Sequence, residues 1–277
     1  MSYAHGRALR AAAAVAAGAV LLAGCSSGGG GDDGKTPRRT PATSASGTQT
    51  PPRPPAPSPT PTGPDFTPDP KRTPRDTADA RRLALAILAG PDDWGPEYVK
   101  RTPSLSLPGA WPVLDGDCEW EVGILPRSVL YSVTAYSEIP AAGGKGPLRV
   151  AATVTVHRTE TDADWEMAET LEEALRCPGQ QLREGERVTG LMSLGTPYGV
   201  SGNTTSTDSL IERGTYLNDG FKGRQFYTWY QTRTGQVTVA AVVKGAPGYT
   251  EAETNAAQVR ANVIMQDRIK AQLGVQP

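Results

Sequence analysis

Only one histidine, His157, follows the first 25 residues of the chain, so Ser–His–Asp hydrolysis would have to use it. That chemistry also needs an activated serine. The segment Tyr198–Gly202 comes near a Gly-x-Ser-x-Gly elbow but lacks its first glycine. His157 ends an alternating apolar segment, next to Arg158. We therefore interpret it as a surface histidine at a strand end and predict no catalytic residue.

Two small groups of acidic residues have ligand types that suit calcium. One contains Asp92, Asp93 and Glu97, and the other contains Asp115 and Asp117. Neither follows the twelve-residue loop pattern of calcium sites. Glycine-rich stretches lie in turns and near the N-terminus rather than between a strand and a helix, so no phosphate loop is indicated. We predict solvated carboxylates, no metal site and no cofactor.

The N-terminus has the three zones of a secretory signal peptide. Arg7 and Arg10 give a positive start, residues 11–23 form an apolar run of 13 residues, and Cys25 follows. A helix needs about 20 residues to span a bilayer, so this run is too short for a permanent transmembrane helix. We predict a signal peptide over residues 1–24.

The sequence Leu22-Ala23-Gly24-Cys25 resembles the bacterial lipobox, in which the cysteine sulfur takes a diacylglyceryl group and becomes the new N-terminus. The resemblance implies a lipoprotein that fatty acyl chains such as palmitate on Cys25 anchor to the cell membrane, facing the extracellular side. Two acyl chains anchor stably, whereas one anchors only marginally. A soluble secreted protein with a chance cysteine here is the alternative.

Cys118 and Cys177 remain as an even pair once Cys25 is assigned to lipid. An even pair in an exported protein is typical of a disulfide. The alternatives are two free thiols or a metal site, although a metal site needs more ligands at close spacing than either cysteine has. We predict a Cys118–Cys177 disulfide, which would stabilise the fold by on the order of 4 kcal/mol.

Residues 25–75 have the composition of a tether. Thirteen prolines fall between residues 26 and 75, and Phe66 is the single aromatic residue there. Such a stretch buries too little apolar surface to offset its chain entropy, so we predict disorder. Residues 76–277 remain for one globular domain. This domain carries 19 basic and 25 acidic side chains, which disfavours nucleic acid as a partner.

Hydrophobic periodicity and turn residues place the elements of the domain. The expected helices cover about 76–88, 161–176 and 250–273; the expected strands cover 118–122, 129–137, 149–157, 187–194, 224–231 and 236–244. Residues 92–117 show no period, and residues 198–220 indicate a loop with at most one strand. Hairpin-joined strands with helices set between them predict an α+β fold, a single domain in which helices pack against an antiparallel sheet.

The helix expected at 161–176 has two distinct faces. Trp165, Ala168, Leu171 and Leu175 share one face, which we expect to be buried. Four glutamates share the other, which we expect to be solvated. They are Glu166, Glu169, Glu172 and Glu173.

The strand at 224–231 carries aromatic side chains on both faces, with Phe226 and Tyr230 on one and Tyr227 and Trp229 on the other. One face must be core, and the other either packs under a helix or lines a groove. Tyrosine and tryptophan suit grooves because they combine apolar area with a hydrogen-bonding edge. If a recess exists, we expect Tyr227 and Trp229 to line it.

An arginine near that recess would meet an anionic group, and Arg224 or Arg233 could supply it. We expect Arg224 near the mouth. The partner residues on the strand at 236–244 are mostly small, which leaves either a close-packed layer or room for a small apolar or aromatic ligand.

The order of these features resembles the extracellular sensor domain of the mycobacterial kinase PknH and related actinobacterial lipoproteins. The strand Val150–Val156 and the acidic helix from Trp165 to Cys177 carry most of the likeness. The kinase sensor has two disulfides, whereas this domain can form one. The resemblance implies ligand binding in a cleft, although no ligand residue transfers. A PsbP-like lipoprotein domain has a similar makeup.

These observations favour a membrane-anchored extracytoplasmic lipoprotein with a non-catalytic, sensor-like or ligand-binding domain. The alternative is an enzyme or an accessory factor in cell-wall or surface-polymer processing. A pocket that gathers His157 with a serine and an acid would favour that alternative.

Overall fold

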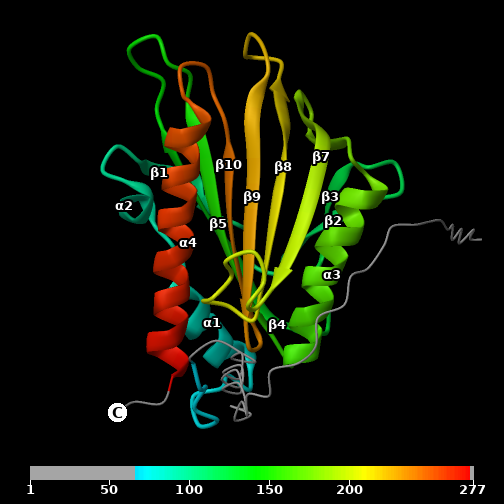
Figure 1. Cartoon of the computed structure of the whole chain (residues 1–277), viewed down its shortest axis with the longest axis vertical. Coiled ribbons are helices and arrows are strands. Elements are labelled where there is room, and N and C mark those ends of the chain that lie inside the picture. Colours follow the sequence, from blue (N-terminus) through cyan, green and yellow to red (C-terminus); the bar gives the residue numbers. More distant parts are fainter. Residues whose placement is uncertain (1–65, 275–277) are drawn as a thin grey trace, which may run out of the picture. The chain divides into compact units, whose positions relative to one another are not determined.

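Ten strands and four helices build residues 66–274, the part of the chain that the computed structural model describes (Figure 1). Eight of the strands form one antiparallel sheet in the order β1-β4-β5-β10-β9-β8-β7-β6. Their bounds are Val99–Leu105 (β1), Val129–Ile139 (β4), Leu148–His157 (β5), Gln180–Arg183 (β6), Glu186–Pro197 (β7), Asp208–Asn218 (β8), Gln225–Thr234 (β9) and Val237–Lys244 (β10). The predicted α+β class is confirmed.

A separate two-stranded hairpin joins β2, Ala110–Leu114, to β3, Trp120–Ile124. The helices are α1, Thr77–Ile87; α2, Pro91–Trp94; α3, Glu160–Arg176; and α4, Glu251–Leu273. Each of the three longer helices begins at a side-chain cap, at Asp76, Thr159 and Thr250 respectively. Such caps satisfy backbone N–H groups that have no partner within the helix.

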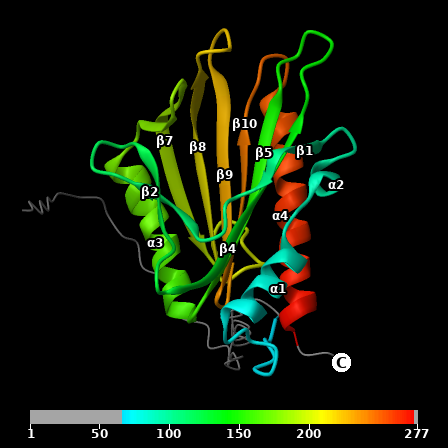
Figure 2. The ribbon, with the colours of Figure 1, turned by 180° about the vertical axis from the view of Figure 1, so that it is seen from behind.

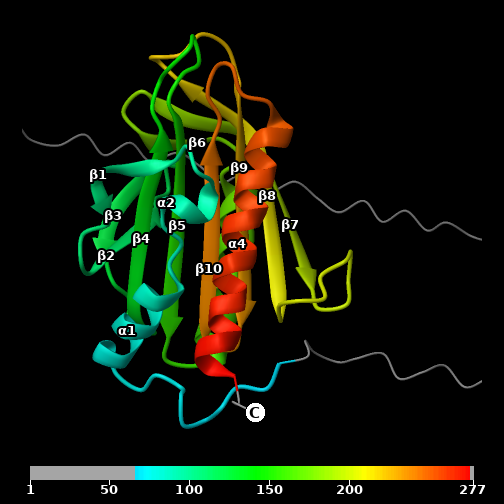
Figure 3. The same ribbon diagram turned by 90° about the vertical axis from the view of Figure 1, so that its left-hand side faces the viewer.

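One face of the sheet, here called the core face, is covered by α1, α2 and α4 (Figure 3). Valines that alternate along β5 and β10 point to this face and pack against Ala261, Met265 and Ile269 of α4. Alternation along a strand sends every second side chain to the same face, so the sequence pattern correctly marks these residues as core.

The opposite face, here called the cavity face, is partly covered by α3 and by the β2–β3 hairpin. Figure 2 shows β2 beside α3, and the Arg176 guanidinium of α3 donates to the Leu114 carbonyl of β2 at 3.2 Å. Threonines such as Thr153 and Thr155 alternate with the core valines of β5 and point to this face. Polar side chains on a covered face need hydrogen-bond partners, so they indicate a polar space between the layers rather than a close-packed apolar core.

One region differs from the prediction. Residues 92–117, where no period was found, hold β1 and β2, whereas residues 198–220 hold the one strand that the sequence allowed there, β8. β1 is an edge strand with mostly exposed side chains, so it lacks the hydrophobic alternation by which strands are recognised. The β9–β10 hairpin, in contrast, turns at Gly235 as predicted.

Residues 66–75, which the composition assigned to the tether, pack against the domain. Phe66 contacts the core, and the Asp69 amide donates to the Leu273 carbonyl at 2.7 Å. Cys25 and the signal peptide lie outside the described residues. Among residues 66–274, none of the helices combines the length and apolar character needed to cross a membrane.

Candidate ligand-binding cavity

A cavity of about 500 Å³ lies between the cavity face of the sheet, α3 and the β2–β3 hairpin. Volumes of this size accommodate drug-sized molecules. β4, β5, β10, β9 and β8 form its floor, and α3 and the hairpin form its other walls. Three groups of side chains line it: aromatic rings, hydroxyls and amides, and charged groups.

The aromatic residues come from both the sheet and the hairpin. They are Trp111, Trp120, Tyr136, Tyr227 and Trp229. Tyr227 and Trp229 thus lie at the recess where the sequence analysis expected them. Two indole N–H groups already donate within the protein, because Trp229 reaches the Gln231 amide oxygen at 3.2 Å and Trp120 reaches that of Gln180 at 2.9 Å. A guest molecule would meet these rings mainly as apolar and π surfaces.

Arg224 does not accompany them. Its side chain is exposed, and it is not among the lining residues of the cavity. Arg233 is also occupied, because its guanidinium pairs with Asp208 at 2.6 Å and Asp164 at 2.9 Å, tying β8 and β9 to α3. Arg224 directly precedes the first residue of β9, and the sequence alone does not show whether a side chain at a strand end points toward a recess or toward solvent.

Basic groups nonetheless line one end of the cavity. They are Arg101, Arg149 and Lys244. The Glu186 carboxylate of β7 accepts from Lys244 and from Arg149 at 3.0 Å each, and Arg183 is a further partner. Burial acts to raise the pKa of Glu186, but the hydrogen bonds and charges of Arg183 and Lys244 outweigh it and, with the Tyr216 hydroxyl, lower that pKa to about 2. Glu138 pairs with Arg101 at 3.5 Å.

Hydroxyl groups connect the strands at the other end. The Ser132 and Thr155 hydroxyls lie 3.0 Å apart, and those of Thr134 and Thr153 lie 2.9 Å apart. Thr170 of α3 donates to the Gln231 amide oxygen at 3.2 Å. These contacts satisfy polar groups on covered strands and leave that end of the cavity polar.

The prediction that His157 is a surface histidine is wrong. The residue is 1% exposed, and its Nε2 lies 2.7 Å from a carboxylate oxygen of Glu166 on α3. The Thr238 hydroxyl donates to the same oxygen at 2.5 Å. β5 ends under the first turns of α3, so the strand end is covered rather than exposed. Within residues 66–274, the Nδ1 atom has no hydrogen-bond partner, so no serine nucleophile stands beside it.

The prediction for the faces of α3 is correct only in part. All four glutamates line the cavity; Glu169 and Glu172 are exposed as predicted, whereas Glu166 and Glu173 are partly buried. Trp165 and Leu175, which were expected to be buried, are 70% and 82% exposed. α3 approaches the sheet through Ala163, Met167 and Ala174 instead. The helix therefore turns its polar side toward the cavity while part of that side stays in contact with solvent, and hydrophobic periodicity cannot distinguish the two situations.

Glu212 of β8 is a further carboxylate of the cavity and is 6% exposed. Burial raises its pKa to about 7, while the Ser193 hydroxyl acts weakly in the opposite direction. Burial also raises the pKa of Glu173 to about 7, and the charges of Glu169 and Glu212 contribute to this. Neither Glu173 nor Glu212 forms a salt bridge with a basic side chain within residues 66–274.

The predicted disulfide fastens the hairpin over the cavity. Cys118 lies in the β2–β3 turn and Cys177 caps the end of α3, with a sulfur–sulfur distance of 2.06 Å. The same region is held by the Arg176 guanidinium, which donates to the Asp115 carbonyl at 2.7 Å, and by the Gln181 amide, which donates to the Cys118 carbonyl at 2.9 Å. The hairpin is thus attached as a cover rather than as part of the main sheet.

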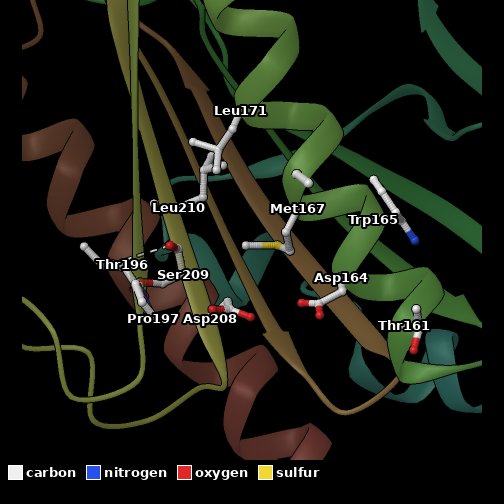
Figure 4. A pocket seen from close by; sticks show the side chains of 12 residues that line it. Thr161, Asp164, Trp165, Met167, Leu171, Thr196, Pro197, Asp208, Ser209 and Leu210 are labelled. Carbon is white, nitrogen blue, oxygen red and sulfur yellow. Dashed lines mark hydrogen bonds between the residues drawn. The ribbon is translucent and has the colours of Figure 1, made fainter.

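A second recess lies on the other flank of α3, along β7 and β8 (Figure 4). Met167 and Leu171 point toward Leu210, and the Thr196 and Ser209 hydroxyls lie 2.5 Å apart at its edge. It lacks the enclosing hairpin and the buried carboxylate of the cavity, so the cavity is the stronger candidate site.

Comparison with protein-family models gives no match, and comparison with characterised proteins gives none. Function is therefore argued from the cavity alone. Several of its residues escaped the sequence analysis. Trp111 and Trp120 belong to a hairpin that was expected to be irregular in part, and Glu212 lies in a region that was expected to be loop-rich with at most one strand. The alternation of threonine with valine on β5 was the available signal for a polar interior.

Proposed function

We propose that this chain is a membrane-anchored extracytoplasmic lipoprotein whose domain binds a small apolar or aromatic ligand in the cavity under α3 and the β2–β3 hairpin. The observation that carries the proposal is the recess of about 500 Å³ with five aromatic residues in its walls. Burial of ligand surface there would contribute about 25 cal/mol per Å².

The anchor belongs to the same proposal. Lipidated Cys25 would hold the chain at the outer face of the cell membrane, and the proline-rich segment after it would place the domain at a distance. A binding domain in this location suits a sensor-like role. The pattern likeness to kinase sensor domains supports that role as an analogy.

Ligand binding can be tested on the chain from residue 25 with Cys25→Ser, which removes the acyl chains. Phenylbutanol should bind and change the tryptophan fluorescence, because three of the five tryptophans line the cavity. Ala240→Trp should abolish the effect, since Ala240 is a buried cavity-floor residue of β10. Val259→Trp on the exposed side of α4 is the matched control. Equal binding by both variants would contradict the proposal.

An enzyme of surface-polymer processing is the second candidate, and the two carboxyls of the cavity at Glu212, which is buried, and Glu173, which is partly buried, favour it. Acid–base hydrolysis of a glycosidic bond uses two carboxyl groups in different protonation states. Here burial raises both pKa values to about 7, whereas catalytic pairs have environments that separate them. We therefore favour binding. Release of soluble sugars from cell-wall preparations, lost in Glu212→Gln, would reverse this preference.

A further inference from the structure

The basic groups around the cavity have carboxylate partners, whereas one of its buried carboxyl groups has no basic partner within the described part of the chain. At the basic end, Arg149 and Lys244 each lie 3.0 Å from a Glu186 oxygen, and Arg101 lies 3.5 Å from Glu138. Those cations have partners within the fold. A ligand with an anionic group would have to displace Glu186 from these cations. The pKa of Glu186 is lowered to about 2, so this carboxylate stays ionised and keeps its cations at neutral pH.

Glu212 is in the opposite situation. Its side chain lines the cavity and is more than nine-tenths buried, and no lysine, arginine or histidine of residues 66–274 forms a salt bridge with it. Glu173 of α3 is a second carboxyl near it, again without a salt bridge. Burying a carboxylate without a cation is costly, and the raised pKa of Glu212 expresses that cost.

Aromatic rings stand beside this carboxyl. Trp229 is the register partner of Glu212 on the neighbouring strand β9, and Tyr227 lies two residues along the same face. The π faces of such rings have a negative electrostatic potential and attract cations, most strongly when the site excludes water. A buried carboxyl group without a salt-bridge partner among the described residues, set beside aromatic rings in a partly covered recess, has the chemistry of a site for a positively charged organic group.

A metal ion is a poorer fit. Within residues 66–274, His, Cys, Asp and Glu form no group of three or more that could hold a metal ion. Metal sites for hard cations need several oxygen ligands around one point. An ammonium group needs fewer, since it binds one or two carboxylates and aromatic faces.

We infer that the ligand of the cavity is an organic amine or quaternary ammonium compound with an apolar or aromatic body, whose cation binds at Glu212 with Glu173 beside it. The inference rests on the proposed binding function and names the ligand class. The apolar body would lie against the aromatic walls and the polar floor would accept any remaining hydrogen-bonding groups.

Three probes of matched shape test this inference on the chain from residue 25 with Cys25→Ser: phenylbutylamine, phenylbutanol and phenylbutyrate. Dissociation constants are measured by tryptophan fluorescence and calorimetry at about pH 8, where the amine is charged and carboxyls with a pKa near 7 are ionised. We expect the amine to bind about tenfold or more tightly than the alcohol, and the carboxylate to bind most weakly.

Two glutamine substitutions locate the contact. Glu212→Gln should weaken amine binding about tenfold relative to phenylbutanol binding, so that the preference for the amine is lost. Glu184→Gln, at an exposed glutamate in the β6–β7 turn, should change neither.

Equal affinity for the amine and the alcohol, or a preference for the carboxylate, would overturn the inference and leave the proposed binding function in place. If the Glu212→Gln and Glu173→Gln variants both still bound the amine more tightly than the alcohol, the assigned contact would be overturned. Failure of all three probes to bind would count against the proposed function as well.

Discussion

The Glu186 carboxylate lies 3.0 Å from the Lys244 ammonium, although β7 and β10 are separated in the sheet by β8 and β9. A second oxygen of Glu186 reaches Arg149 on β5, at 3.0 Å. Strands that are three or four places apart in a flat sheet would lie well over 10 Å apart. The sheet therefore curls at this end, and one buried carboxylate joins its two halves and closes the cavity there.

Loss of the Glu186 carboxylate should destabilise the curved sheet. Glu186→Gln leaves Lys244 and Arg149 without their anion, and we expect the free energy of unfolding to fall by about 2–4 kcal/mol. Urea unfolding at neutral pH measures this. Glu184→Gln, two residues away and exposed, should have almost no effect. Equal stability of the two variants would show that the Glu186 contacts do not hold the sheet together.

The stability of the domain should depend on pH in two windows of opposite sign. Burial raises the pKa of Glu212 from 4.5 to about 7, so this group contributes stability below pH 4.5 that is lost as pH rises toward 7. Glu173 acts in the same direction. The lowered pKa of Glu186 has the opposite effect, because its contribution is present above pH 4.5 and is lost as pH falls toward 2.

The variant Glu212→Gln distinguishes the contribution of Glu212 from that of Glu186. The glutamine stays neutral at all pH values, so the variant should be more stable than the wild type at pH 8 by about 1–3 kcal/mol and nearly equal to it at pH 4. Groups that face Glu212, namely Glu173 of α3 and Tyr227 of β9, remain in both proteins. Thermal unfolding at pH values between 4 and 8 gives the comparison. A parallel shift at every pH would contradict the assignment.

The Cys118–Cys177 disulfide should hold the cover of the cavity as well as the fold. We expect the double substitution Cys118→Ala with Cys177→Ala to lower the free energy of unfolding by about 2–4 kcal/mol and to speed the release of bound phenylbutanol. Denaturant unfolding and stopped-flow fluorescence measure the two effects. Reductant should reproduce both in the wild type and change nothing further in the double variant. Unaltered release in a destabilised variant would mean that the hairpin does not limit exit.

Membrane attachment depends on Cys25 in this account. Cys25→Ser should move the protein from the membrane fraction to the medium or leave its signal peptide uncleaved, because serine cannot take a diacylglyceryl group. Fractionation and intact-mass measurement distinguish these outcomes. A cleaved, lipid-free Cys25→Ser protein that stayed in the membrane fraction would refute the anchor. Wild-type protein should carry the added mass of at least two acyl chains.

Much of the fold follows from local patterns in the sequence, and the site follows only in part. Valines at every second residue of β5 and the capping box at Thr250 are signals that lie within a few residues, so they predict the strand and α4 correctly. Tyr227 and Trp229 could be placed at a recess for the same reason.

The rest of the site depends on contacts between distant segments. Glu212 and Glu173 are 39 residues apart, and only the packing of α3 over β8 brings them into one cavity. The acidic face of α3 looks identical in sequence whether water or a polar cavity covers it. His157 is an example of the same limit, since a strand end is exposed or buried according to which helix follows it across the sheet.

His157 is expected to act in the structure rather than in catalysis. Its buried ring joins β5 to α3 through Glu166, with Nε2 and the carboxylate oxygen 2.7 Å apart. His157→Ala should therefore lower the free energy of unfolding by about 2–4 kcal/mol, from lost packing and from a carboxylate left with fewer partners. His157→Gln, which keeps a donor, should recover part of that loss. Phenylbutanol affinity should change little in folded protein, because His157 does not line the cavity. A hydrolase activity that His157→Ala abolished while the fold survived would show that this histidine is catalytic.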